Sequence, residues 1–162
     1  MSSNRDNTKQ NYKIAAVKSD FNLEITSNLL TGARNYLKKH KEISAELFLY
    51  SVPGAFEIPF MVSRLIAENQ RNNYSGILTL GSIIKGETAH FEYISNSTIQ
   101  ALATLNTTSP IPISLGIITT YNLEQAKSRS SDNLQNKGYE AMSALYGMMH
   151  PSTFTGHKLS SY

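Results

Sequence analysis

The chain has 162 residues, a formal net charge of +3 and no cysteine. This length suits one domain with a substantial core, and the lack of cysteine excludes disulfides, thiolate nucleophiles, cysteine-bound zinc and iron–sulfur clusters. The mild positive charge forms no basic stripe of the kind that nucleic-acid binding needs, so we expect no nucleic-acid partner.

The polar residues 1–11 predict a flexible N-terminal arm. They contain no apolar segment typical of a secretion signal, and no later run is long enough to span a bilayer. We therefore expect a cytoplasmic protein without a membrane partner.

The first half of the chain alternates between predicted strands and helices. A short apolar run over residues 12–19 is typical of a buried strand, and Asn22 can cap the helix that follows. A second strand is predicted over 45–52, and a polar loop over 68–74 follows the second helix. Both helices carry apolar residues at helical spacing: Ile25, Leu29, Leu30, Ala33, Tyr36 and Leu37 in the first, and Ile58, Met61, Val62, Leu65 and Ile66 in the second.

The second half continues this alternation. A strand over 76–80 precedes a glycine-containing turn and a helix with an apolar stripe from Tyr93 to Leu105. A fourth strand is predicted over 113–119, and two shorter helices over 123–129 and 137–149. The last helix ends at His150 and Pro151, and residues 150–162 predict a flexible tail.

Four apolar strands that alternate with helices favour a parallel sheet covered on both faces. We therefore predict an α/β fold with one domain over residues 12–149. In such a sheet, ligands bind beyond the carboxyl ends of the strands. The ends of all four strands are thus expected to line one site.

Two strand ends carry candidate ligand contacts with open alternatives. Phe21 either stacks on a planar ligand or packs as a hydrophobic staple on the following helix. Glu57 lies in a turn with two prolines and a glycine, where it either faces a ligand or complements the helix dipole. For Phe21, position alone favours the staple slightly. For Glu57, position does not separate the two alternatives.

The segment after the third strand predicts an anion site. Gly81 and Gly86 have the spacing of a P-loop, but Glu87 replaces the lysine that contacts the phosphates, which argues against a nucleoside triphosphatase. A single phosphate held near Glu87 and Thr88 fits the helix start better. His90 follows two residues later and is a candidate for proton transfer.

Other charged residues carry weaker signals. Glu87, His90 and Glu92 lie on diverging faces of one helix, so a metal site is not expected. Arg129 ends a short helix and carries no signal by itself, and Lys137 follows a capping Asn136 and can face ligand or water.

Six motifs occur in order along the chain: FNLEIT (21–26), VPGAFEIP (52–59), LGSIIKGETAHFEY (80–93), GIITT (116–120), EQA (124–126) and NKG (136–138). Together they resemble the lumazine synthase family over roughly residues 12–149. The resemblance implies a flavodoxin-like three-layer sandwich and a four-stranded parallel sheet. It also implies an enzyme of riboflavin biosynthesis that uses no metal or organic cofactor.

The resemblance further implies the reaction and the roles of the site residues. The family condenses 5-amino-6-(D-ribitylamino)uracil with 3,4-dihydroxy-2-butanone 4-phosphate to give 6,7-dimethyl-8-ribityllumazine, phosphate and water. His90 is expected to be the catalytic proton donor and acceptor. The expected substrate contacts are Phe21, Ala55, Phe56, Glu57, Ser82, Ile83, Ile84, Glu87, Thr88, Leu115, Arg129 and Lys137. Among them, the resemblance implies that Glu87, Thr88 and Arg129 bind the butanone phosphate.

The chain departs from the family pattern at several positions. Leu115 replaces a usual phenylalanine, Lys85 a usual arginine and Ser97 a common glutamate, and residues 131–135 replace a Gly-rich turn. Leu115 leaves one alternative open, a family member that binds flavin or lumazine, or serves as a shell, with little turnover. Flavodoxin-like electron transfer is disfavoured, because the chain has no tryptophan and no Ser/Thr-rich loop after the first strand.

The resemblance also implies assembly. In this family the pocket lies between adjacent subunits of a homopentamer, and some members close pentamers into an icosahedral shell. The proline-free arm and the length of the turn after Arg129 favour the shell.

Overall fold

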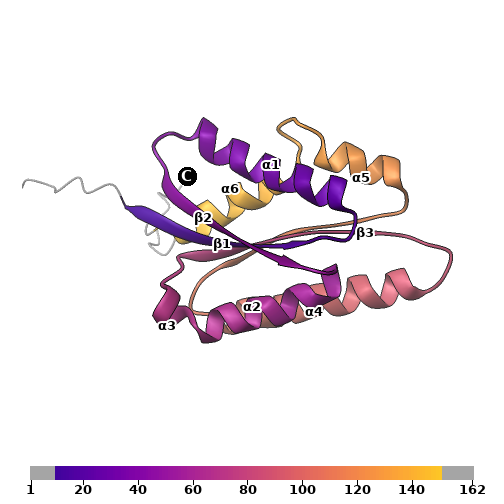
Figure 1. Cartoon of the computed structure of the whole chain (residues 1–162), viewed down its shortest axis with the longest axis horizontal. Helices are drawn as coiled ribbons and strands as arrows, with labels where there is room; N and C mark the ends of the chain where they lie inside the picture. Colours follow the sequence, from indigo (N-terminus) through magenta and orange to yellow (C-terminus); the bar gives the residue numbers. More distant parts are fainter. Residues whose placement is uncertain (1–9, 151–162) are drawn as a thin grey trace, which may run out of the picture.

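The computed structural model describes residues 10–150, which form a three-layer α/β sandwich (Figure 1). Four parallel strands lie in the order β2-β1-β3-β4. Helices α1, α5 and α6 cover one face of the sheet, and α2 and α4 cover the other. The elements are β1 (Asn11–Ser19), α1 (Leu23–Lys39), β2 (Ser44–Val52), the 3-10 turn η1 (Ala55–Glu57), α2 (Ile58–Ala67), α3 (Asn69–Asn72), β3 (Gly76–Ile84), α4 (His90–Thr108), β4 (Ile113–Thr120), α5 (Leu123–Ser130) and α6 (Lys137–Met149).

The central strands β1 and β3 explain the layered fold. Their side chains are buried on both faces, because each face is covered by helices. Ile14 and Leu78 pack toward α1 and α6, whereas Val17 and Ile77 pack toward α2 and α4. The predicted flavodoxin-like class with a four-stranded parallel sheet is confirmed.

Strand β3 is longer than its predicted span of 76–80, because it pairs with β4 as far as Ile84 and Thr120. Gly81 therefore lies inside a strand and not in a turn. A Cβ at Gly81 would lie 3.2 Å from Ile58 Cδ1 and 3.3 Å from Ile117 Cγ1, so glycine permits close packing there. The helix that follows begins at His90, after the predicted anion-binding segment.

Several local predictions need correction. Asn22 occupies the N-cap position of α1, but it is left-handed, with φ 57° and ψ 49°, and its side chain makes no cap hydrogen bond. The predicted loop over 68–74 contains the short helix α3. Tyr93 of the predicted α4 stripe is exposed. Asn11, placed in the flexible arm, begins β1; the rest of the predicted arm, apart from Gln10, and the tail beyond His150 lie outside the described residues.

Helices α1 and α6 lie so close together at Gly138 that one added methyl group is expected to destabilise the fold strongly. A Cβ at Gly138 would lie 1.8 Å from the backbone oxygen of Leu29. We expect Gly138→Ala to lower the free energy of unfolding by about 3 kcal/mol, since the helices must separate. Urea unfolding of the variant and the wild type at equal protein concentration measures the difference in the free energy of unfolding.

Gly147→Ala is the matched control, because a Cβ there meets nothing within 4 Å. We expect it to raise the free energy of unfolding by roughly 0.5–1 kcal/mol through the higher helix propensity of alanine. Equal urea midpoints of unfolding for Gly138→Ala and the wild type would contradict the close contact between Gly138 and Leu29.

Candidate active site

An open pocket of about 510 Å³ lies where the strands end. Strand β3 supplies one wall of the pocket with Ser82, Ile83 and Ile84. Its pairing with β1 ends at Leu80, whereas its pairing with β4 continues to Ile84. The backbone beyond Leu80 therefore has one edge outside the β1 ladder, where a planar polar ligand can hydrogen-bond.

The short loop over residues 20–22, between β1 and α1, forms a second wall of the pocket. Two backbone hydrogen bonds hold it to the end of β2, from Asp20 N to Val52 O at 2.8 Å and from Phe21 N to Pro53 O at 3.0 Å. Asn22 Nδ2 donates to Ser82 O at 3.0 Å and so ties the loop to β3. Phe21 itself is 70% exposed and lines the pocket. Such exposure excludes a staple on α1 and leaves the ring face available to a ligand.

The turn η1 forms the third wall with Gly54, Ala55, Phe56 and Glu57. Ala55 is buried and anchors the turn, whereas the other two η1 side chains are exposed. A Cβ at Gly54 would lie 2.9 Å from Glu57 Oε2, so the carboxylate sits close over the backbone. Glu57 makes no side-chain cap bond to α2, although it occupies the N-cap position.

The segment before α4 brings Gly86, Thr88 and His90 to the same pocket. Thr88 Oγ1 accepts a hydrogen bond of 3.4 Å from the backbone N–H of His90, the first residue of α4. The imidazole is exposed at the pocket. Glu87, between Gly86 and Thr88, is exposed, and its side chain is not part of the pocket lining.

Two apolar residues of α4, Phe91 and Ile94, also line the pocket and were not predicted as site residues. Ile94 lies four positions after His90, and this helical spacing could have placed it on the same face. Lys85 Nζ lies 3.0 Å from Glu92 Oε1. This hydrogen-bonded lysine lowers the pKa of the Glu92 carboxyl, which therefore remains an anion near neutral pH.

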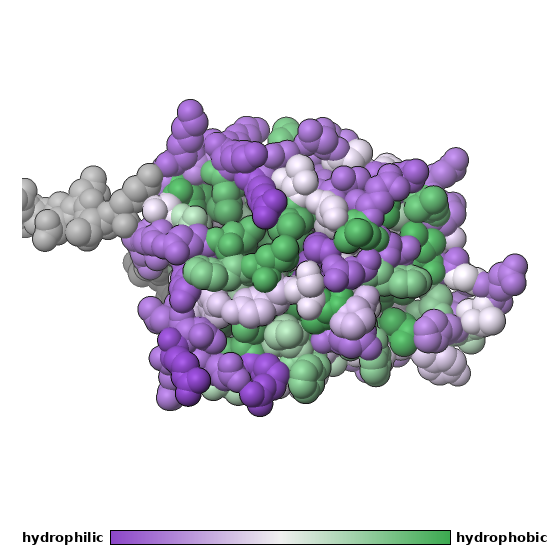
Figure 2. Space-filling view, in the orientation of Figure 1, coloured by the Kyte–Doolittle hydropathy of each residue, from purple (hydrophilic) through white to green (hydrophobic). Residues whose placement is uncertain are grey.

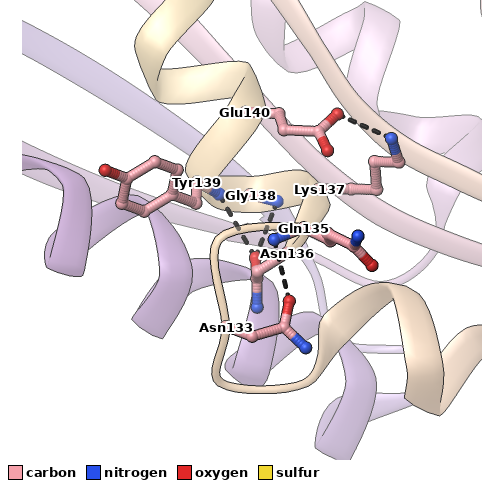
Figure 3. Close-up of polar contacts among 7 residues, drawn as sticks. All are labelled: Asn133, Gln135, Asn136, Lys137, Gly138, Tyr139 and Glu140. Carbon is pink, nitrogen blue, oxygen red and sulfur yellow. Dashed lines mark hydrogen bonds and ion pairs between the residues drawn. The ribbon is translucent and has the colours of Figure 1, made fainter.

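Leu115, Arg129 and Lys137 lie elsewhere, in a separate hollow of about 210 Å³ beside β4. Arg129 belongs to α5 and Lys137 to α6, and both helices cover the opposite face of the sheet from α4. Lys137 Nζ forms an ion pair with Glu140 Oε2 at 2.6 Å (Figure 3). One chain therefore divides the predicted contacts between two hollows.

Residues 10–150 contain no group of three or more His, Cys, Asp or Glu side chains that could hold a metal ion. Over the same residues, no helix has the length and apolar character needed to cross a membrane.

Comparison with known proteins identifies the family. A family model described as 6,7-dimethyl-8-ribityllumazine synthase matches residues 11–152. The chain is 38% identical to the protein of that name from Wolinella succinogenes over 144 residues, 89% of this chain and 90% of the relative. It is 41% identical to the Limosilactobacillus reuteri protein of that name over 140 residues, 86% of this chain and 89% of the relative. The chain belongs to the 6,7-dimethyl-8-ribityllumazine synthase family.

Proposed function

We propose that the chain condenses 5-amino-6-(D-ribitylamino)uracil with 3,4-dihydroxy-2-butanone 4-phosphate, and releases 6,7-dimethyl-8-ribityllumazine, phosphate and water. The observation that carries this proposal is one open pocket that joins Phe21, Thr88 and His90 in a chain of this family. The pocket presents an aromatic face, backbone groups, a hydroxyl and an imidazole to the same space.

These groups suit the two substrates in different ways. The exposed ring of Phe21 stacks on the pyrimidine, and the backbone of Ile83 and Ile84, beyond the end of the β1 ladder, hydrogen-bonds its polar rim. The η1 turn, with Phe56 and Glu57, holds the ribityl chain. Thr88 binds the butanone phosphate near the start of α4.

His90 transfers the protons of the reaction. Schiff-base formation, loss of phosphate and ring closure each require a proton to be moved, which suits an imidazole near neutral pH. Its exposure at the pocket leaves it free to contact substrate. Because both substrates are reactive once aligned, holding them together supplies much of the rate.

Incubation of the purified protein with both substrates tests the proposed function directly. We expect lumazine to form with one equivalent of phosphate released. Riboflavin or lumazine binding without turnover would contradict the proposal and favour a binding or shell protein.

The stacking role predicts a selective effect of Phe21→Ala. We expect the KM for the pyrimidine substrate to rise about 10-fold, because stacking on an aromatic ring is worth about 1–1.5 kcal/mol. The free energy of unfolding is expected to change little, since the side chain is 70% exposed. Steady-state kinetics with each substrate varied in turn measures both KM values. A rise in only the butanone phosphate KM would contradict the stacking role.

We further propose that the active form is a homopentameric ring in which the second hollow of one subunit completes the pocket of the next. Strands β2 and β4 are the two edges of the sheet, and each edge carries exposed apolar side chains. Leu49 belongs to β2, and Leu115 of β4 lines a hollow together with Met148. Figure 2 shows apolar groups at the surface between the helical layers. Contacts between two different faces are head-to-tail, and such contacts form a ring where the rotation between neighbouring subunits closes. Light scattering distinguishes the free pentamer from an icosahedral shell.

A further inference from the structure

The amide of Asn136 holds together the elements that carry Arg129 and Lys137. This side chain is 1% exposed. Its Oδ1 accepts hydrogen bonds from Gly138 N at 2.8 Å and Tyr139 N at 3.2 Å, and so caps α6 (Figure 3). The cap that the sequence predicts at this position is therefore confirmed.

The nitrogen of the same amide makes a second set of contacts. Asn136 Nδ2 donates to the backbone oxygens of Ser130 at 2.8 Å, Ser131 at 3.1 Å and Asn28 at 3.1 Å. The first two oxygens end α5, and the third belongs to α1. One buried amide thus joins three helices through five hydrogen bonds.

The contact between Ser130 and Asn136 joins the chain next to each of the two cationic residues of the second hollow. Arg129 precedes Ser130, and Lys137 follows Asn136. Their helices α5 and α6 are joined by a loop whose other side-chain contacts, such as Asn133 Oδ1 to Gln135 N, are exposed. The buried amide is thus the contact that sets the position of one cation relative to the other.

We propose that Asn136 is a positioning residue that acts through Arg129, which it holds in place relative to Lys137, to set the affinity for the phosphate-bearing substrate. The inference rests on the proposed function for the identity of that substrate. It is specific to the donor half of the amide, because the acceptor half serves the helix cap.

Asn136→Asp separates the role of the donor nitrogen of the amide from that of the acceptor oxygen. Aspartate keeps the oxygen that caps α6, but it replaces the donor with an oxygen that faces three backbone oxygens. We expect the KM for butanone phosphate to rise about 10-fold, while kcat changes less than about 2-fold. Gln135→Ala, which changes an exposed amide at the adjacent position, is the matched control and is expected to leave both constants unchanged.

Gly32→Ala gives an independent perturbation that keeps Asn136 itself. A Cβ at Gly32 in α1 would lie 2.0 Å from Asn136 Oδ1, so the amide must move. Alanine favours the helix more than glycine, yet we expect the same rise in KM. Gly147→Ala, in open space on α6, is the control for the change of propensity.

A double-mutant cycle distinguishes positioning from general destabilisation. If Asn136 acts through Arg129, Asn136→Asp adds no further rise in KM to Arg129→Ala. Calorimetric titration with inorganic phosphate gives the same comparison without turnover. Unchanged KM and phosphate affinity in both Asn136→Asp and Gly32→Ala, or multiplied effects in the double variant, would overturn the inference. A wild type that binds phosphate but forms no lumazine contradicts the proposed function instead.

Discussion

Replacing His90 with alanine is expected to lower kcat for lumazine formation by about 100-fold, at the lower end of the range for loss of an acid–base group. The imidazole lines the pocket, and the methyl group of alanine can neither donate nor accept a proton. The loss is limited because alignment of two reactive substrates still supplies much of the rate. Both KM values are expected to change little, since Phe21 and Thr88 remain in place. Steady-state kinetics measures all three constants.

His40→Ala is the matched control for this substitution. His40 lies at the other end of the fold, after α1, where its ring packs on Tyr36 and its Nδ1 lies 2.9 Å from Glu42 Oε1. We expect it to leave kcat unchanged and to lower stability slightly. If His90→Ala reduced kcat no more than His40→Ala does, the proton-transfer role of His90 would be wrong.

The sequence predicts the fold well where local signals agree with tertiary structure. The bounds of α6 are predicted as residues 137–149 and are found there, because Asn136 caps its start and a proline follows His150. The end of β3 is predicted wrongly. Its last residues are held by pairing with β4, since Ile84 pairs with Thr120, and the local sequence pattern around Gly81 does not indicate that long-range pairing.

The site is predictable only in part from the residues themselves. The edge-of-sheet rule and the short distance from Gly86 to His90 place an anion site beside an imidazole. By contrast, Arg129 carries no signal by itself, and it enters only through the family resemblance. Its position on the other face of the sheet, with Lys137, follows from chain topology that local sequence does not encode. The chemical roles of these residues stay predictions.

The division of the site predicts that two inactive variants restore each other. Arg129→Ala removes charged hydrogen bonds to phosphate worth about 1.5–3 kcal/mol, so kcat/KM is expected to fall up to about 100-fold. His90→Ala is expected to lower kcat, and with it kcat/KM, to a similar degree. In the proposed ring, a site shared by neighbours would take its pocket from one subunit and its arginine from the next, because different residues of each chain line the two hollows.

Co-expression of the two variants in one cell is therefore expected to form mixed rings with some intact sites. In a random equal mixture, about a quarter of head-to-tail interfaces join an unaltered His90 to an unaltered Arg129. Activity at low substrate is then expected to reach about a quarter of the wild type, far above either variant alone. Rings purified separately and mixed without subunit exchange are the control and should stay nearly inactive. If co-expression gave only the average of the two weak activities, each chain would hold its own complete site and the shared ring site would be wrong.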